Sequence, residues 1–170
     1  MLPAMFRKAR KLASEEDLYA AGLRALMRRA HSVYEMRQAL ERRAEEKSLA
    51  RRVLERLKRE GLLDDARYAR QFARQHAESR RQGRFRIARD LRARGVPDRH
   101  IEAALEEIFA ETDEAALVRK RIERRLRSLG GPLDERRLAS LYRSLMRAGF
   151  SSDLIRTELR AATKREVEEL

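Results

Sequence analysis

An arginine-rich stretch is the part of the sequence whose residue types could do chemistry. Residues 80–96, RRQGRFRIARDLRARGV, hold seven arginines in seventeen positions and a single acid, Asp90. The planar guanidinium of arginine forms paired hydrogen bonds with phosphates and carboxylates. A charge-rich helix face is most often only solvated, and exposed ion pairs contribute little to stability. The shortage of acids nevertheless favours a surface that binds an anionic polymer, or a protein assembled on one.

Helical geometry divides this stretch into two faces. At about 100° per residue, Ile87 and Leu91 point to the buried side. The opposite side presents three arginines, which we call the arginine stripe: Arg86, Arg89 and Arg92. Phe85 adjoins the stripe and could stack on a base, and Arg80 and Arg81 lie in the preceding connection. We predict that these six side chains bind an anionic polymer such as nucleic acid, or a protein assembled on one.

A second set of cations lies in the last third of the chain. Leu141 and Leu145 repeat the apolar spacing, and three arginines accompany them: Arg136, Arg143 and Arg147. The run RKRIERRLR at 119–127 adds another basic helix, for which we predict a solvated side. Cationic faces distributed along the chain suit a long polymeric target, because linked weak contacts raise the effective concentration.

Catalysis and metal binding are not indicated. His31, His76 and His100 are isolated and cysteine is absent, so we expect no zinc site and predict surface or capping roles for the histidines. Asp64 and Asp65 directly precede an apolar helical pattern, which predicts N-capping rather than acid–base chemistry. The sequence contains no phosphate-cradling P-loop motif. We therefore expect no enzyme activity, no cofactor and no bound metal.

The composition indicates which class of partner and which cellular compartment to expect. The 170 residues include 41 Lys and Arg against 28 Asp and Glu, which gives a formal net charge of +13 and a pI near 11.0. A field of that sign concentrates polyanions, so nucleic acid heads the list of partners. No apolar run approaches the roughly 20 residues of a membrane span, and no secretory signal pattern is present. We expect a cytoplasmic protein without membrane contact.

Residue usage predicts an all-α fold. Leucine, alanine, glutamate and arginine dominate, and no β-branched run alternates with period two. Hydroxyl and acidic residues mark predicted helix starts: Ser14, Asp64, Asp65, Thr112 and Asp113. Glycines mark predicted helix ends: Gly61, Gly95, Gly130 with Gly131, and Gly149.

An internal repeat organises these helices. Five residues recur after 54 positions: Ile87, Leu91, Gly95, Ile101 and Leu105 return as Leu141, Leu145, Gly149, Ile155 and Leu159. A weaker match at a shift of 51 extends the repeat toward the start of the chain, with Ala44 opposite Gly95. We predict an elongated, curved tandem array of three three-helix modules. Their boundaries are 18–63, 64–111 and 112–162, with an N-terminal extension at 1–17 and a tail at 163–170.

Two strings in the middle of the chain resemble the RecX family of bacterial regulators of the RecA recombinase. The first is GLLDDARYARQF, residues 61–72, and its matching positions are Leu62, Leu63, Asp64, Asp65, Tyr68, Ala69 and Phe72. The second is ESRRQGRFRIARDLRARGV, residues 78–96, and its matching positions are Ser79, Arg80, Gly83, Arg86, Ile87, Leu91, Gly95 and Val96. The resemblance extends from about Leu18 to Leu159. It departs from the family's glycine-containing turn at RRAEEKSLA.

The resemblance implies a regulatory function. A protein similar to RecX would lie along the RecA filament on DNA and suppress strand exchange, ATP turnover and co-protease function. Its partners would be the RecA filament and single- or double-stranded DNA, bound weakly and without sequence preference. The family's fold, tandem three-helix units in an elongated arc, agrees with the repeat, and we expect a monomer.

A direct DNA-binding module of the helix-turn-helix type, such as a transcription factor, is the alternative. Small helical triplets place a basic third helix in the major groove. Here the arginine stripe lies on the middle helix of its module, and the third helix, RHIEAALEEIF, is acidic. This distribution disfavours base reading by that helix.

Overall fold

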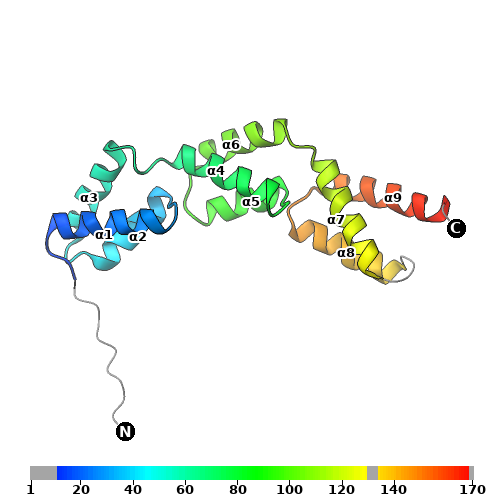
Figure 1. The fold of residues 1–170 in the computed structure, drawn as a ribbon, viewed down its shortest axis with the longest axis horizontal. Coiled ribbons are helices and arrows are strands. Elements are labelled where there is room, and N and C mark those ends of the chain that lie inside the picture. Colours follow the sequence, from blue (N-terminus) through cyan, green and yellow to red (C-terminus); the bar gives the residue numbers. More distant parts are fainter. Residues whose placement is uncertain (1–10, 130–133, 169–170) are drawn as a thin grey trace, which may run out of the picture. The chain divides into compact units, whose positions relative to one another are not determined.

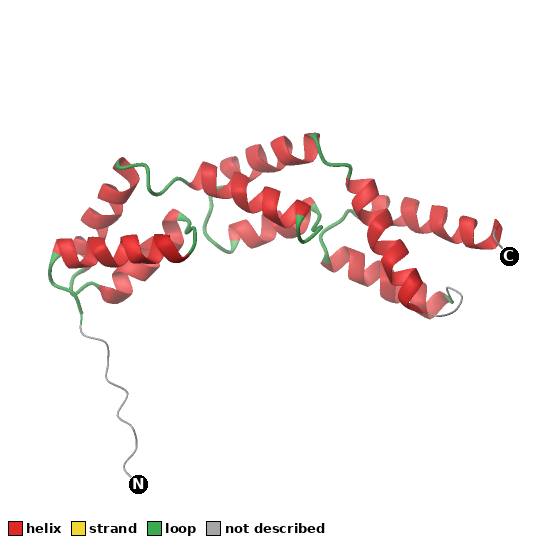
Figure 2. Cartoon of the chain, in the orientation of Figure 1, coloured by secondary structure: helices red, strands yellow, loops and turns green. Residues whose placement is uncertain are grey.

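A computed structural model describes residues 11–129 and 134–168 of the chain. This part contains nine α-helices and no strand, with one isolated parallel β-bridge between Leu12 and Ala44 (Figures 1 and 2). The predicted all-α, tandem helical architecture is confirmed. The predicted helix end at Gly130 and Gly131 lies outside the described residues.

The chain divides into two compact units. Unit 1 runs to Tyr68 and also takes in Arg94–Val96, whereas unit 2 comprises Ala69–Ala93 and the chain from Pro97 onward. Unit 1 contains α1 (Glu15–Arg28), α2 (Val33–Arg43) and α3 (Lys47–Arg59), and α4 (Asp65–Glu78) begins in it and continues into unit 2. Unit 2 contains α5 (Arg84–Arg92), α6 (Asp98–Ala110), α7 (Glu114–Leu129), α8 (Glu135–Arg147) and α9 (Ser152–Glu168). The predicted module boundaries at 63/64 and 111/112 fall in the connections that precede α4 and α7.

Side-chain caps begin several helices. Asp64 Oδ1 accepts hydrogen bonds from the backbone amides of Ala66 and Arg67 at 2.9 and 3.1 Å, so the predicted N-cap of α4 is confirmed. Its neighbour Asp65 instead accepts from the amide of Val33, at the start of α2, at 2.9 Å. Asp113 Oδ1 similarly accepts from the amide of Ala116 at 3.0 Å. Such caps satisfy amides that the first helical turn leaves without a partner.

The core of unit 1 lies between α1, α2 and α3. These three helices contact one another pairwise. Buried side chains of these helices, and of the residues that follow α2 and α3, form one cluster: Leu18, Ala25, Met36, Leu40, Ala44, Leu49, Ala50, Val53, Leu54, Leu57 and Leu63. Spacings of three and four residues place these side chains on the inward stripe of each helix, and burial of that stripe drives the packing.

Unit 2 contains a second apolar cluster between α7, α8 and α9. It consists of Val118, Ile122, Leu141, Leu145, Ala148, Phe150, Ile155, Leu159 and Ala162. In the same unit α5 packs against α6, where Ile87, Leu91 and Ile101 are fully buried. The repeated residues of the sequence are therefore mainly core residues, and the prediction that Ile87 and Leu91 face inward is confirmed.

The repeat also recurs as a hydrogen bond to a backbone carbonyl. In each case a carbonyl just before Ala44, Gly95 or Gly149 accepts a hydrogen bond from an earlier segment of the same unit. The three bonds run from Leu12 N to the Arg43 oxygen at 2.7 Å, from Ser32 Oγ to the Arg94 oxygen at 2.6 Å, and from Gly83 N to the Ala148 oxygen at 2.9 Å. We call these three acceptors the turn carbonyls. They are separated by the same 51 and 54 positions that the sequence repeat shows.

Candidate functional site

The arginine stripe lies on α5, on the side opposite the buried Ile87 and Leu91. The side chains of Arg86, Arg89 and Arg92 are 36%, 65% and 55% exposed. Helical periodicity thus brings the three predicted cations to one solvent-facing side, as the spacing indicates. The apolar face of α5 is packed in the core of unit 2, so the stripe lies on a rigid helix.

Two carboxylates accompany the three guanidinium groups of the stripe. Asp90 lies 2.8 Å from Arg86 Nε and 3.8 Å from Arg89 Nε, and Asp98 lies 2.7 Å from Arg92 Nε. Each arginine of the stripe thus has an acidic neighbour, and one positive charge remains uncompensated. Exposed ion pairs of this kind contribute about 0–1 kcal/mol, so a phosphate or a partner's carboxylate can replace the internal acid at low cost.

Phe85 lies at the start of α5 and keeps a ring in solvent. The residue is 59% exposed, which makes it unlike Phe109 and Phe150, both of which are buried. The backbone amide of Phe85 donates to the carbonyl of Gly149 at 3.1 Å, so the residue is anchored by its main chain. An exposed ring on a fixed backbone is available for stacking on a base or packing on a protein.

Arg80 and Arg81 lie in the connection between α4 and α5, and their backbone is held in place. Arg121 of α7 donates from Nη2 to the Arg80 oxygen at 2.8 Å and from Nε to the Arg81 oxygen at 2.9 Å. Arg81 has a φ of 50°, in the left-handed region that most residues avoid. The Arg80 side chain is exposed and that of Arg81 is half-buried. Sequence reasoning missed Arg121, because its partners lie about 40 positions earlier.

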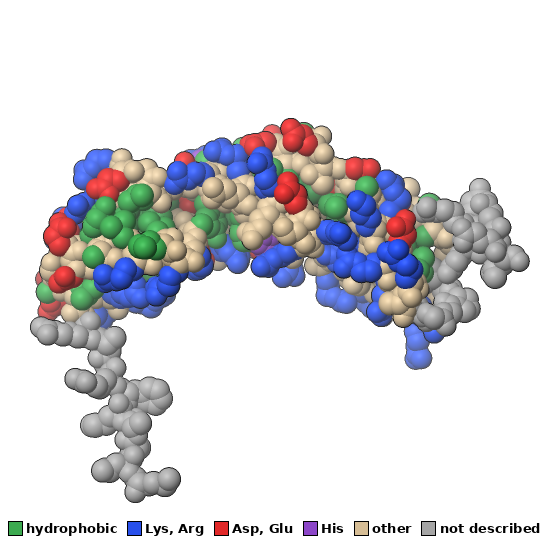
Figure 3. All heavy atoms as spheres, viewed as in Figure 1, with side chains coloured by type: hydrophobic (Ala, Val, Ile, Leu, Met, Phe, Trp, Pro, Cys, Tyr) green, Lys and Arg blue, Asp and Glu red, His purple; other side chains and the backbone are tan. Residues whose placement is uncertain are grey.

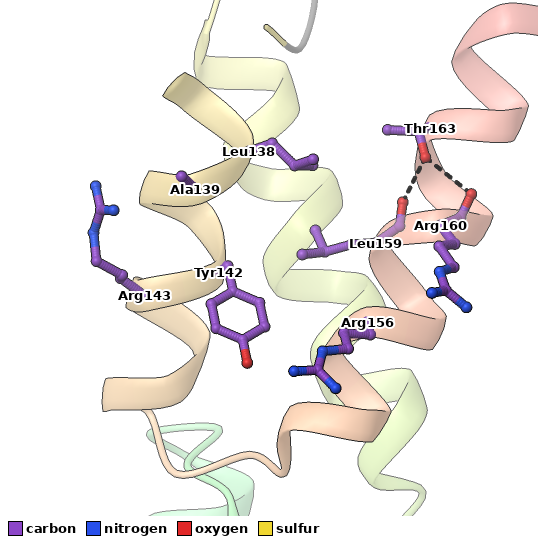
Figure 4. A pocket seen from close by; sticks show the side chains of 8 residues that line it. All are labelled: Leu138, Ala139, Tyr142, Arg143, Arg156, Leu159, Arg160 and Thr163. Atoms are coloured by element: carbon purple, nitrogen blue, oxygen red, sulfur yellow. Dashed lines mark hydrogen bonds between the residues drawn. The ribbon is translucent and has the colours of Figure 1, made fainter. Parts of the chain in front are cut away.

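The three arginines of the second predicted set are exposed on α8: Arg136, Arg143 and Arg147. Arg143 also borders a groove of about 440 Å³ between α8 and α9 (Figure 4). The ring of Tyr142 points from α8 toward α9, and Arg156 and Arg160 project from α9 (Figure 4). Because the groove has an apolar floor that includes Leu138 and Leu159, this surface suits contact with protein better than contact with a bare phosphate.

Other arginines serve the packing of unit 2. Arg84 Nε lies 3.0 Å from Glu114 Oε2, and its guanidinium lies 5.2 Å from the centre of the Phe109 ring. Arg119 lies 3.0 Å from the buried Glu158 and 3.2 Å from Asp113. The pairs with Glu114 and Glu158 join segments 30 and 39 positions apart in the sequence, and they distinguish Arg84 and Arg119 from the arginines of the stripe.

In the described residues, no group of three or more His, Asp or Glu side chains is placed to hold a metal ion. The prediction of a surface or capping role was wrong for His76, which is 6% exposed. Its ring stacks on Phe72 at 3.8 Å, and its Nδ1 lies 2.8 Å from Gln82 Oε1. The helix period that places residues 72 and 76 on one face could have identified it as a core residue.

Positive side chains are distributed over the surface of both units. Figure 3 shows Lys and Arg side chains over the helices of each unit, with carboxylates among them. None of the described helices is long and apolar enough to cross a lipid bilayer.

Two family models match the chain. One describes the second three-helix domain of RecX and matches residues 64–105, and the other describes the third three-helix domain and matches residues 111–159. Together they cover more than half of the 170 residues.

Curated relatives match nearly the full length of the chain. Regulatory protein RecX of Halorhodospira halophila is 42% identical over 150 residues, which covers 88% of this chain and 91% of that protein. Regulatory protein RecX of Trichlorobacter lovleyi is 38% identical over 144 residues, with coverage of 82% and 92%. Among solved structures, RecX from Lactobacillus salivarius has a similar fold, with a TM-score of 0.74 at 21% identity and coverage of 86% and 95%.

Proposed function

The chain belongs to the RecX family of regulatory proteins, and from that premise we propose that it binds the RecA filament on DNA and inhibits strand exchange, ATP turnover and co-protease function. Its relatives are regulatory proteins by name, and the match extends over nine-tenths of the H. halophila protein. We further propose that it acts in the cytoplasm as a monomer and without catalysis of its own.

The observation that carries this proposal is the arginine stripe. Three guanidinium groups share one exposed side of α5 and have two carboxylates between them, Asp90 and Asp98. Because the internal pairs are weak, the arginines can exchange them for phosphates of DNA or for acids on the filament's protein surface. The exposed ring of Phe85 beside the stripe adds a contact that does not depend on charge.

Direct base reading by a helix-turn-helix element is not favoured. Helix α6 follows the Gly95 turn and would be the recognition helix of such an element, yet it exposes Glu102, Glu106 and Glu107. Carboxylates at those positions would repel the phosphates that flank a groove. Sequence-selective duplex binding that survives raised salt would support this alternative.

An inhibition assay with the cognate recombinase tests the proposal. We expect sub-stoichiometric amounts of the protein to lower the recombinase's DNA-dependent ATP hydrolysis and strand exchange. Binding to bare single-stranded DNA, measured in parallel, should be weak and steeply salt-dependent. Unchanged ATP hydrolysis at saturating amounts of folded protein would reject the proposed inhibition.

A further inference from the structure

A second cationic feature lies in unit 2, apart from the arginine stripe. It is a hollow of about 270 Å³ between α7 and α8. Its lining consists of Arg121, Arg124, Arg125, Ser128, Leu141, Ser144 and Leu145. In Figure 3, Lys and Arg side chains gather over α7, the helix that provides all three arginines. The sequence alone predicts a solvated side for this helix and does not reveal the hollow, because three of its seven lining residues come from α8.

The described lining of the hollow carries positive charge and includes no Asp or Glu. Within the part of the chain that the structure describes, Arg121, Arg124 and Arg125 form no ion pair, whereas Arg119 on the same helix contacts both Asp113 and Glu158. The arginines of the hollow thus differ from Arg119, whose charge is paired with two carboxylates.

Arg121 is positioned before any ligand arrives. Two of its five N–H groups are used by the carbonyls of Arg80 and Arg81, at 2.8 and 2.9 Å, which fixes the guanidinium plane. Burial lowers the pKa of Arg121, and repulsion by Arg124 and Arg81 lowers it further. An anion in the hollow would relieve that repulsion, which favours the binding of an anion there.

The remaining groups of the lining suit an oxyanion. Leu141 and Leu145 are 5% and 2% exposed and form an apolar wall that strengthens nearby electrostatic interactions. Ser144 has a hydroxyl that can donate a hydrogen bond, while Ser128 already donates to the Arg125 carbonyl at 2.7 Å. Guanidinium groups bind phosphate through paired N–H donors, which a single lysine cannot supply.

We infer that the hollow between α7 and α8 is a phosphate-binding site, with Arg124 and Arg125 as direct ligands and Arg121 as the fixed cation beside them. The site goes beyond the proposed function, because it does not involve the arginine stripe and does not require the recombinase. It rests on the proposed function only for the source of the phosphate, which would then be the DNA backbone in the filament.

The test uses the full chain labelled with ¹⁵N in its arginine side chains. Inorganic phosphate is added at constant ionic strength, with chloride as the reference salt, and the Nε–Hε signals are followed by NMR. We expect the signals of Arg121, Arg124 and Arg125 to shift along one saturable curve. The double variant Arg124→Gln/Arg125→Gln should weaken this binding by about tenfold or more, because it removes both paired donors.

A control variant with the same loss of charge distinguishes binding in the hollow from a general effect of positive charge. Lys120→Gln/Arg127→Gln removes the same two charges from exposed positions of α7 outside the hollow, and it should bind phosphate as the unmodified chain does. Equal weakening in both double variants, or shifts that chloride reproduces, would overturn the inference. Circular dichroism at 222 nm checks that both variants remain helical.

Two further titrations identify the source of the phosphate. If a ten-nucleotide oligothymidylate saturates the hollow at a lower concentration of phosphate groups than ATP does, the site is assigned to a phosphodiester backbone. If ATP saturates it at the lower concentration, the site is assigned to a free nucleotide. Since no recombinase is present, loss of phosphate binding would leave the proposed inhibition standing. A chain that binds phosphate but fails to inhibit would instead reject the proposed function alone.

Discussion

Glu35 shows how single residues fix the local structure of unit 1. Its carboxylate accepts hydrogen bonds from Arg29 Nη1 at 3.0 Å and from the Ser32 amide at 3.2 Å. Ser32 Oγ in turn accepts from the Glu35 amide, which completes a capping box at the start of α2. Burial alone would raise the pKa of Glu35, but the bonds from Arg29 and Ser32 outweigh it and hold the pKa below its usual value of 4.5.

The first prediction concerns the pH dependence of this capping box. Glu35→Gln should lower the free energy of unfolding by about 1 kcal/mol at pH 7, because it loses the charge-assisted bonds. A lowered folded-state pKa means that the stabilisation is present above pH 4.5 and is lost as the pH falls through the folded-state value. The difference in the free energy of unfolding between the variant and the unmodified chain should therefore narrow as the pH falls below 4.5. Urea unfolding followed at 222 nm measures both quantities.

Glu41→Gln on the same helix is the control for Glu35→Gln. Its carboxylate forms no ion pair among the described residues, so its removal should change stability little at either pH. An equal loss of stability in both variants would contradict the assignment of the effect to the capping box.

Phe85 carries the second prediction. Because the residue is 59% exposed, Phe85→Ala should change the free energy of unfolding by less than about 0.5 kcal/mol. If the ring stacks on a base, the same variant should weaken binding to single-stranded DNA by about 1–3 kcal/mol. Fluorescence anisotropy with a labelled oligonucleotide measures this. Met27→Ala, at an 85% exposed position on α1, is the control, and equal affinities of the two variants would remove Phe85 from the binding surface.

At the residue scale the sequence predicts local contacts well and distant ones poorly. Two predictions depend only on neighbours within one helical turn: the N-cap at Asp64 and the inward orientation of Ile87 and Leu91. The capping box of Ser32 and Glu35 was missed, although its three-residue spacing is readable. Arg121 could not have been assigned, because its partners belong to a connection about 40 residues away.

At the scale of elements, the turns after α2, α5 and α8 share one contact although their sequences differ. Each turn carbonyl receives a donor from an earlier segment, but the donor changes from the amide of Leu12 to the hydroxyl of Ser32 and the amide of Gly83. The repeat in the sequence predicts that these turns are equivalent. It cannot predict the donors, because they lie outside the repeated apolar positions.

Close backbone approach at one of these turns gives the third prediction. Gly149 has a φ of +91°, and a Cβ there would lie 2.3 Å from the Cβ and the amide nitrogen of Arg86. Gly149→Ala should therefore destabilise the chain by more than the roughly 1–2 kcal/mol of left-handed strain alone. Gly61→Ala is the matched control for Gly149→Ala, since the φ of Gly61 is +71° and nothing lies within 4 Å of the added carbon. Urea unfolding should show a clearly larger loss for Gly149→Ala, and equal losses would contradict the close contact.

At the scale of the whole molecule, the net charge of +13 is spread over many exposed side chains. The sequence predicts this excess and the all-α tandem fold, since both depend on composition and helical period. It predicts less well which arginines are available to a partner. Arg84 and Arg119 are engaged in packing and Arg124 is not, a distinction that depends on where distant carboxylates lie in the fold.

Salt dependence provides the fourth prediction. For single-stranded DNA, the logarithm of affinity falls with the logarithm of salt concentration by about 0.7 for each phosphate neutralised. Replacing Arg86, Arg89 and Arg92 by Gln should therefore flatten the slope by about 2 if all three contact phosphates. The control replaces three exposed arginines of unit 1 by Gln: Arg24, Arg28 and Arg51. An equal change in both slopes would show that net charge, and not the arginine stripe, sets the affinity.

The most direct test of the proposed function is the inhibition of the cognate recombinase by a charge-reversed stripe. ATP hydrolysis on single-stranded DNA is measured with the unmodified chain, with Arg86→Glu/Arg89→Glu/Arg92→Glu, and with Arg24→Glu/Arg28→Glu/Arg51→Glu as a control of equal charge. We predict strong inhibition by the unmodified chain and the control, and much weaker inhibition by the stripe variant with its helicity intact. Equal inhibition by all three proteins would contradict the role of the arginine stripe.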